Sequence, residues 1–271
     1  VIADQQNNIL FCQYKRHFSE IKSTVADILE QAQKELGNIS FTAMLTGSGG
    51  VSIAKSLGID FIQEVVATAK AIETAAPKTD VAIELGGEDA KIIYFSNGIE
   101  QRMNGICAGG TGSFIDQMAS LLQTDAGGLN ELAKKHTTIY PIASRCGVFA
   151  KTDIQPLINE GAAKEDLAAS IFQAVVNQTI SGLACGKPIR GHIAFLGGPL
   201  HFLSELRQRF IETLKLTEET ALLPENSHLF AAYGTAISND ENGKVMGFAA
   251  LLENIRNGEE LTMEVNRLEP L

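Results

Sequence analysis

The stretch VAIELGGEDAKIIYF, residues 81–95, decides the fold of this 271-residue chain. The run from Val81 to Leu85 is typical of a strand, Gly86-Gly87 of a turn, and the run from Ala90 to Phe95 of a returning strand. A hairpin of this kind, joined to units of strand, glycine turn and helix, is the usual beginning of an α/β domain.

The residues before this hairpin repeat the same order of elements. Residues 1–18 read as strand, polar turn and strand, and Ile21 to Leu36 has the apolar spacing of an amphipathic helix. A short strand from Phe41 to Leu45 then runs into TGSGG and another helix. Two rounds of this order predict two similar α/β subdomains that face a cleft.

The residues after the hairpin predict a helical region and then a second strand. We expect helices at 148–159, 167–184, 202–214 and 229–238, a strand within HIAFLGG (192–198), and a short helix at 248–255. The polar stretch SNDENGK at 238–244 indicates a break. The predicted domains are therefore 1–78, 79–240 with a last helix returning to the first, and a linker or tail at 241–271 towards a further module.

The composition excludes several classes of partner. There are 22 Lys and Arg against 32 Asp and Glu, a net charge of −10, which argues against a nucleic acid or an anionic membrane. By inspection no apolar run approaches the about 20 residues that a bilayer requires. The four cysteines stand far apart and form no CxxC pair, so we expect a reducing, cytoplasmic setting and no mononuclear zinc site.

Four glycine-rich turns follow predicted strands, at 47–50, 86–87, 109–112 and 197–198. Glycine permits positive φ and lets backbone N–H groups approach an anion closely. Glu88 and Asp89 follow one of these turns, where a carboxylate can hold a magnesium-bound water. One such turn is explained by chain reversal alone, but four in one chain favour a nucleotide-phosphate site.

Cys107 and Cys146 each precede an apolar-periodic helix. The positive end of a helix dipole stabilises a thiolate there. Three roles stay open: a nucleophile, a buried structural thiol, or a ligand of an iron–sulfur cluster shared by two chains across a twofold axis. Cys12 and Cys185 are interpreted as structural.

Three further side chains have open roles. His201 stands beside a glycine turn and is a candidate nucleotide contact, while Lys151 and Asp153 fit either a helix surface or the cleft.

Four stretches carry a family resemblance. NGICAGGTGSFIDQMA (104–119), SRCGVFAKTDI (144–154), IELGGEDAKII (83–93) and FLGGPLHF (195–202) resemble the ATP-dependent activators of 2-hydroxyacyl-CoA dehydratases, which are kin to the ATPase subunits of benzoyl-CoA reductase, the BcrAD/BadFG type. The similarity covers roughly residues 1–240. GGPLHFLSEL is most similar to the long, double-repeat members.

The resemblance implies an actin/hexokinase/Hsp70-like (ASKHA) fold and a homodimer that binds ATP or ADP with Mg²⁺ and one bridging [4Fe–4S] cluster. It assigns Cys107 and Cys146 as cluster ligands. It assigns the remaining positions to the nucleotide: Glu88 and Asp89 as catalytic residues of the second phosphate loop, with Gly86, Gly87, Gly110, Thr111, Gly112 and the adenosine loop Gly197 and Gly198 as binding residues.

The implied function is that of an ATPase coupled to electron transfer. ATP binding and hydrolysis would change the angle between the cluster-bearing helices and drive a low-potential electron into a partner dehydratase or reductase, in an anaerobic cell. The electron donor would be a ferredoxin or a flavodoxin. The alternatives are a non-catalytic ASKHA module of a larger protein and a small-molecule kinase of the same superfamily.

The chain departs from the family pattern at several places. The first phosphate loop would precede Val1, Glu88 stands where Gln is usual, Lys151 stands where short activators carry Glu, and GGPLHF lacks their Asn.

Overall fold

The computed structural model describes residues 1–18, 20–96, 98–104, 109–143, 147–238 and 243–257. The chain divides into two compact units. Unit 1 combines residues 1–71 with the segment that begins at Ala231, and unit 2 spans Ile72–Phe230. The sequence predicts divisions after residues 78 and 240, whereas the two units divide after residues 71 and 230.

Unit 2 is built on one five-stranded sheet with the order β10-β9-β6-β7-β8. Its strands are β6 (Val81–Leu85), β7 (Ala90–Tyr94), β8 (Glu100–Met103), β9 (Ile193–Leu196) and β10 (Ala221–Leu222). The first three form an antiparallel meander, while β9 runs parallel to β6 and β10 parallel to β9. The predicted hairpin at 81–95 is therefore confirmed as β6 and β7.

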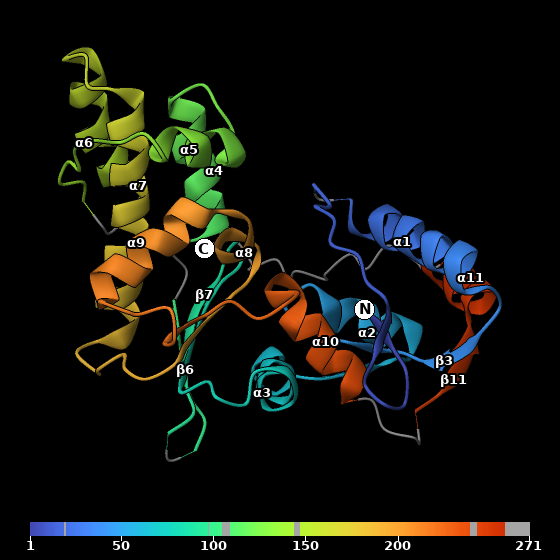
Figure 1. Cartoon of the computed structure of the whole chain (residues 1–271). Coiled ribbons are helices and arrows are strands. Elements are labelled where there is room, and N and C mark those ends of the chain that lie inside the picture. Colours follow the sequence, from blue (N-terminus) through green and yellow to red (C-terminus); the bar gives the residue numbers. More distant parts are fainter. Residues whose placement is uncertain (19, 97, 105–108, 144–146, 239–242, 258–271) are drawn as a thin grey trace, which may run out of the picture. The chain divides into compact units, whose positions relative to one another are not determined.

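The helices of unit 2 gather over one face of this sheet (Figure 1). They are α4 (Gly112–Leu121), α5 (Ala126–Ala133), α6 (Gly147–Asn159), α7 (Lys164–Thr179), the π-helix η1 (Ile180–Ala184), α8 (Gly198–Phe202), α9 (Ser204–Leu214) and the 3-10 turn η2 (Ser227–Leu229). Alternate β6 residues, Val81, Ile83 and Leu85, share one buried cluster with Ile115 and Phe172 of the helices. This alternation follows from the period of two in a strand.

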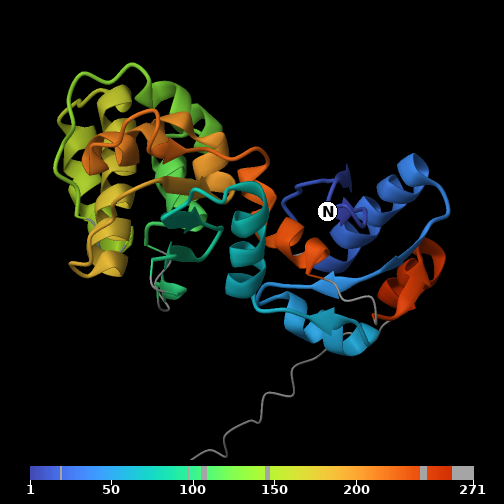
Figure 2. The same cartoon turned by 60° about the horizontal axis from the view of Figure 1, so that its bottom comes forward.

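The long helix α7 lies in the middle of this layer. Together with η1 it is the one stretch among the described residues, Lys164–Ala184, that is long and apolar enough to cross a membrane by length and composition. This apolar stretch is longer than the sequence pattern predicted. However, 67% of its apolar window is buried, and α7 packs against α5 and α9 (Figure 2), as the core helix of a globular domain does.

Two predicted elements are interrupted in the structure. The helix expected at 202–214 is divided, because Leu203 is extended and separates α8 from α9. In unit 1, the strand expected at Phe41–Leu45 becomes two short strands on either side of Ala43. Strand β8, with the polar sequence EQRM, is not predicted at all, because pairing with β7 rather than residue type forms it.

Unit 1 contains three separate two-stranded sheets and five helices among its described residues, counting α3 and α10, which cross into unit 2. The elements are β1 (Ile2–Ala3), β2 (Ile9–Phe11), α1 (Ile21–Leu36), β3 (Ser40–Thr42), β4 (Met44–Leu45), α2 (Gly50–Leu57), β5 (Asp60–Phe61), α3 (Glu64–Ala75), α10 (Phe230–Ile237), β11 (Val245–Gly247) and α11 (Phe248–Asn257). The strand pairs are β1–β2, β11–β3 and β4–β5. Helix α1 has the predicted bounds.

The segment expected to be a linker at 241–271 is part of unit 1 over its described portion. Strand β11 pairs with β3 in antiparallel register, and α11 packs against α1. Phe248 is 2% exposed and its ring lies 4.8 Å from that of Phe41. The polar residues before β11 are typical of a linker, but the apolar face of α11 completes the core of unit 1.

Candidate nucleotide site

Three of the four predicted glycine turns meet at one edge of the unit 2 sheet. In the parallel pair of β6 and β9, Glu84 stands opposite Leu196, so the turns that follow both strands leave the same edge. The helix α4, which begins at Gly112, is bonded to the first of these turns. The fourth turn, at 47–50, belongs to unit 1.

Among the glycines of these turns, Gly197 lies closest to the backbone of a neighbouring strand. Its φ is +86°, and a Cβ at this position would lie 2.1 Å from the carbonyl oxygen of Leu85. Only glycine fits such a contact, because any side chain would collide with the β6 backbone. The glycine therefore brings the turn after β9 against the end of β6.

The turn from Gly86 to Asp89 is bonded directly to the first turn of α4. The Gly86 N–H donates to the Asp89 carbonyl at 2.7 Å, which closes the turn. The Gly112 N–H donates to Gly86 O at 2.9 Å, and the Ser113 N–H to Gly87 O at 2.7 Å. The Ser113 hydroxyl also donates to Gly87 O at 2.8 Å. A displacement of this turn therefore acts on the start of α4 without an intermediate residue.

Gly110 and Thr111 connect α4 to the rest of the helical layer. Gly110 has φ +82°, and a Cβ there would lie 3.2 Å from Gln178 Cγ and 3.4 Å from Thr179 Oγ1. Thr111 is fully buried and its carbonyl accepts the Ile115 N–H, which begins the helix. Gly110 therefore holds the turn before α4 against the end of α7, and Thr111 begins the helix.

The two residues predicted to be catalytic, Glu88 and Asp89, belong to the turn that begins at Gly86. Glu88 is exposed and Asp89 is half-buried. A Cβ on Gly87 would meet nothing within 4 Å, so the turn leaves space for an anion to approach. This arrangement fits a phosphate with a hydrated Mg²⁺ next to it, since Mg²⁺ keeps several waters and takes one or two carboxylates.

Two buried charges near the turn were missed by the sequence analysis. Glu84 and Lys91 stand directly opposite each other on β6 and β7, and both are less than 9% exposed. Opposite charges at facing positions of a buried strand pair offset the cost of burial. The alternation of the strand, with Glu84 between Ile83 and Leu85, was the available signal.

Asn104 is a further site residue that the sequence does not reveal. Its amide nitrogen Nδ2 donates to Glu88 O at 3.3 Å, and its Oδ1 accepts the Ala90 N–H at 2.7 Å. Its own N–H donates to Ala90 O at 3.0 Å. Asn104 therefore joins the end of β8 to the turn, a contact that depends on the pairing of β7 with β8.

The turn at Gly197 is held by a second segment, at η2. The Gly197 N–H donates to Ser227 O at 3.1 Å, and the Ser227 hydroxyl is 2.8 Å from His201 Nδ1. Burial lowers the pKa of His201, and the positive charge of Arg207 lowers it further. Ser227 was not predicted, since nothing in the sequence links it to a turn thirty residues earlier.

The predicted cluster ligands Cys107 and Cys146 lie outside the described residues. Their described neighbours are close to each other: a Cβ on Gly147, which begins α6, would lie 3.5 Å from Phe114 Cδ2 of α4. Among the described residues, no group of three or more His, Cys, Asp or Glu side chains fits a metal ion.

The other side chains named from the sequence are placed as follows. Cys12 and Cys185, interpreted as structural from the sequence, are free and exposed, and Cys185 Sγ donates to Gly182 O at 3.3 Å. Lys151 is exposed on α6, and Asp153 Oδ2 accepts the Ala143 N–H at 2.7 Å, so Asp153 anchors the chain before α6.

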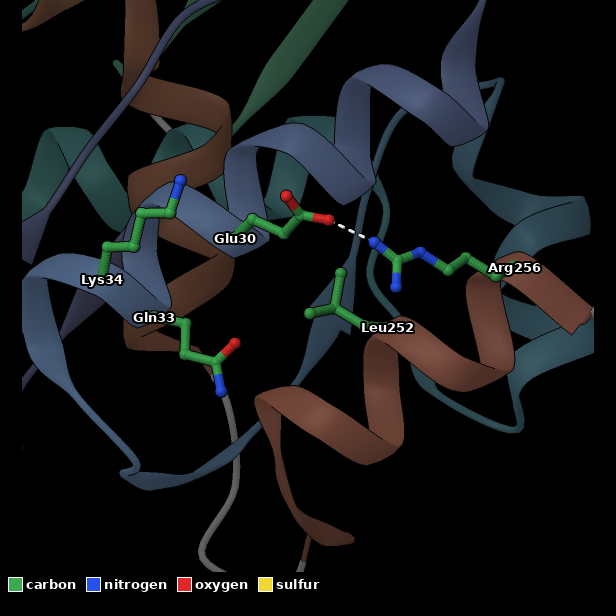
Figure 3. A pocket seen from close by; sticks show the side chains of 5 residues that line it. All are labelled: Glu30, Gln33, Lys34, Leu252 and Arg256. Atoms are coloured by element: carbon green, nitrogen blue, oxygen red, sulfur yellow. Dashed lines mark hydrogen bonds and ion pairs between the residues drawn. The ribbon is translucent and has the colours of Figure 1, made fainter.

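Unit 1 has a hollow that is lined by other residues than those of the glycine turns. Glu30, Gln33 and Lys34 of α1 line it together with Leu252 and Arg256 of α11 (Figure 3). Glu30 and Arg256 form an ion pair across it. The hollow contains none of the predicted site residues. It is the groove between the packed helices α1 and α11.

Comparisons with known proteins relate this chain to a family of ATPases. The sequence profile of the BadF/BadG/BcrA/BcrD ATPase family matches residues 7–219. The (R)-2-hydroxyglutaryl-CoA dehydratase activating ATPase of Acidaminococcus fermentans is 32% identical over 65% of this chain and 67% of its own length. A 2-hydroxyisocaproyl-CoA dehydratase activator of Clostridioides difficile is 30% identical over 51% of this chain, and the match spans about half, 52%, of that relative.

Solved structures of such activators have the same fold. Component A of the Acidaminococcus fermentans (R)-2-hydroxyglutaryl-CoA dehydratase aligns with a TM-score of 0.67 and 28% identity, over 80% of this chain and 82% of that one. The activator of a 2-hydroxyisocaproyl-CoA dehydratase from Clostridium difficile, solved with bound ADPNP, aligns with a TM-score of 0.68 over 79% of both chains, at 24% identity. The predicted actin-like ASKHA fold is confirmed. Since the profile covers most of the chain, including all three converging turns of unit 2, the protein belongs to the BadF/BadG/BcrA/BcrD ATPase family.

Proposed function

We propose that this protein is an ATP-dependent activase that couples ATP binding and hydrolysis to low-potential electron transfer into a CoA-substrate-specific dehydratase or reductase. The observation that carries the proposal is the convergence of three glycine turns at the carboxyl edge of β6 and β9 in a member of an ATPase family. Ligands of open α/β sheets bind at this edge.

The nucleotide part of the proposal uses described residues. The turn at Gly86-Gly87 takes the phosphates, Gly110–Gly112 hold that turn in place, and Gly197-Gly198 takes the adenosine. Glu88 and Asp89 would hold a hydrated Mg²⁺ and would orient the water that attacks in hydrolysis. The open space at Gly87 and the exposure of Glu88 support this assignment.

The redox part of the proposal depends on Cys107 and Cys146. Two chains, each contributing both thiolates, complete the four ligands that a [4Fe–4S] cluster requires. The closeness of α6 and α4 supports it: a Cβ on Gly147, which directly follows Cys146, would lie 3.5 Å from Phe114 Cδ2 in the helix after Cys107. When bound, the cluster supplies one low-potential electron.

The coupling between the two parts follows from hydrogen bonds. Gly86 O and Gly87 O accept three bonds from Gly112 and Ser113, so the phosphate turn and the first turn of α4 move together. We therefore propose that nucleotide exchange at the turn changes the direction of α4.

The proposed partners are a second copy of this chain, a dehydratase-like or benzoyl-CoA-reductase-like protein, and a ferredoxin or flavodoxin as electron donor. We propose a reducing cytoplasm as the setting, in which exposed thiols such as Cys12 and Cys185 remain free.

The test is anaerobic purification followed by iron, sulfide and ATPase analysis. We expect about two iron atoms per chain, since four are shared by two copies. Cys107→Ser should lose the iron and keep ATP binding, because the phosphate turns are intact. Cys12→Ser and Cys185→Ser are matched controls and should keep both. An iron-free wild-type protein, or iron retained by both Cys107→Ser and Cys146→Ser, would contradict the proposed redox role.

A further inference from the structure

All four carbonyl groups of the turn from Gly86 to Asp89 are occupied by hydrogen bonds. Those of Gly86 and Gly87 accept the N–H groups of the first turn of α4, at 2.9 and 2.7 Å. The Glu88 carbonyl accepts Asn104 Nδ2 at 3.3 Å, and the Asp89 carbonyl accepts the Gly86 N–H at 2.7 Å. The turn is therefore held through its acceptors, by α4 and by the residue that follows β8.

The N–H groups of the same turn remain free of protein acceptors. Among the described residues, the N–H groups of Gly87, Glu88 and Asp89 donate to no protein atom. The other two turns at this sheet edge use donors within the protein, as the Gly197 N–H does with Ser227 O. Three consecutive free donors on one turn are typical of a backbone site for an anion.

The direction of each free N–H follows from the carbonyl before it. A trans peptide unit is planar, so its C=O and its N–H point in opposite directions. The carbonyl of Gly87 therefore fixes the N–H of Glu88, and the carbonyl of Glu88 fixes the N–H of Asp89. The groups that hold these two carbonyls decide where the two donors point.

Two side chains hold these carbonyls. The Ser113 hydroxyl donates to Gly87 O at 2.8 Å, in addition to the backbone bond from the same residue. Asn104 Nδ2 donates to Glu88 O, while Asn104 Oδ1 accepts the Ala90 N–H at 2.7 Å and so fixes the plane of the amide. The two side chains come from different elements, and both act on the one turn.

We propose that Asn104 and Ser113 are positioning residues of the nucleotide site, which direct the N–H groups of Asp89 and Glu88 towards the bound phosphates. Each acts through the carbonyl that it holds rather than by contact with the nucleotide. This inference rests on the proposed function, because the phosphates occupy the Gly86-Gly87 turn. It makes the affinity for phosphate depend on two polar side chains outside the glycine pattern.

The test variants remove one donor each and keep the other bonds of the same residue. Asn104→Asp keeps an acceptor for the Ala90 N–H but cannot donate to Glu88 O, because an ionised carboxylate only accepts. Ser113→Ala removes the hydroxyl and leaves the backbone bond to Gly87 O.

The ligands separate phosphate binding from binding of the nucleoside. Isothermal titration calorimetry on the full chain gives the Kd of MgATP and of magnesium tripolyphosphate, and equilibrium dialysis gives that of adenosine. For the loss of one hydrogen bond we expect the Kd of both phosphate ligands to rise about three- to tenfold in each variant. The Kd of adenosine, which has no phosphate, should change less than about twofold. Ser113→Thr retains a hydroxyl and should retain the wild-type affinities.

Each variant has a matched control. Gln101→Glu adds the same negative charge to β8, at a position that pairs with Ile93 rather than with the turn. Ser120→Ala removes a hydroxyl from the same helix, where it donates to Asp116 O within α4 at 2.9 Å. Both controls should leave all three Kd values unchanged.

Three results would overturn the inference. An equal weakening of adenosine would mean that the variants disrupt the whole site, and unchanged Kd values for the phosphate ligands would mean that the turn needs neither side chain. A loss in Gln101→Glu as large as that in Asn104→Asp would mean that charge alone acts. Wild-type protein that binds neither MgATP nor tripolyphosphate would instead refute the proposed function.

Discussion

Gly197 and Gly87 show how differently two glycines of the candidate site are constrained. Gly197 combines φ +86° with a backbone oxygen 2.1 Å from the position of a Cβ, whereas Gly87 has no atom within 4 Å of that position. The first glycine is required for the sheet edge to close, and the second only leaves room for a ligand.

We therefore expect Gly197→Ala to destabilise unit 2 by more than about 2 kcal/mol, through strain and a displaced β6 end. Gly87→Ala should change the unfolding free energy by less than about 0.5 kcal/mol. Chemical denaturation followed by circular dichroism measures both. Equal stabilities of the two variants would show that the close approach at Gly197 is relaxed in solution.

The irregular segment 137–143 shows how an element without regular structure is held in place. Asp166 Oδ1 accepts the N–H groups of Thr137 at 2.6 Å and Thr138 at 2.9 Å. Ser170 Oγ accepts the Tyr140 N–H, and Asp153 accepts that of Ala143. The segment is thus fixed to α6 and α7 immediately before the residues around Cys146.

These bonds predict an acid-sensitive element. The backbone donors of Thr137 and then of Thr138 hold the pKa of Asp166 below its usual value. A carboxylate with a lowered folded-state pKa contributes stability above its unfolded pKa of about 3.9, and this contribution is lost as the pH falls through the folded value.

We expect Asp166→Asn to lower the Tm by a few degrees at pH 7 and to flatten the dependence of Tm on pH below about 4. The control is Glu165→Gln, a substitution of the neighbouring residue on α7. It should change neither the Tm at pH 7 nor the dependence of Tm on pH. Scanning calorimetry between pH 3 and 7 measures the effect. Parallel pH curves for wild type and Asp166→Asn would exclude this role for the carboxylate.

At the scale of the whole molecule, the chain returns to complete its first unit. Helix α11 and strand β11 join a core formed by the N-terminal residues, with Phe248 and Leu252 packed among Phe11, Ala32 and Ile59. Unit 1 is therefore discontinuous in sequence, and its stability depends on residues more than two hundred positions apart.

Phe248→Ala tests this dependence. Removing a buried phenylalanine typically costs about 3–5 kcal/mol, so we expect α1 to lose protection in amide hydrogen exchange measured by mass spectrometry. Val245→Ala, at a 65% exposed position of β11, is the control and should have no such effect. If α1 remains protected in Phe248→Ala, the segment is the linker that the sequence analysis expected.

Local patterns in the sequence determined much of the fold. The run 81–95 specified β6, its turn and β7, the apolar spacing of 21–36 specified α1, and the glycines marked the turns of the site. Each of these is encoded within a few neighbouring residues, because strand alternation, helical periodicity and positive φ are local properties.

Only the tertiary structure decided what these elements build together. It formed β8 from a polar stretch, separated Phe202 in α8 from the rest of the helix expected at 202–214, and placed α11 in unit 1. It also brought Gly86, Gly112 and Gly197 to one sheet edge, with Asn104 and Ser227 beside them. The physical reason is that strand order and register depend on backbone pairing and burial between segments far apart in the chain, and no local residue pattern records which segments will meet.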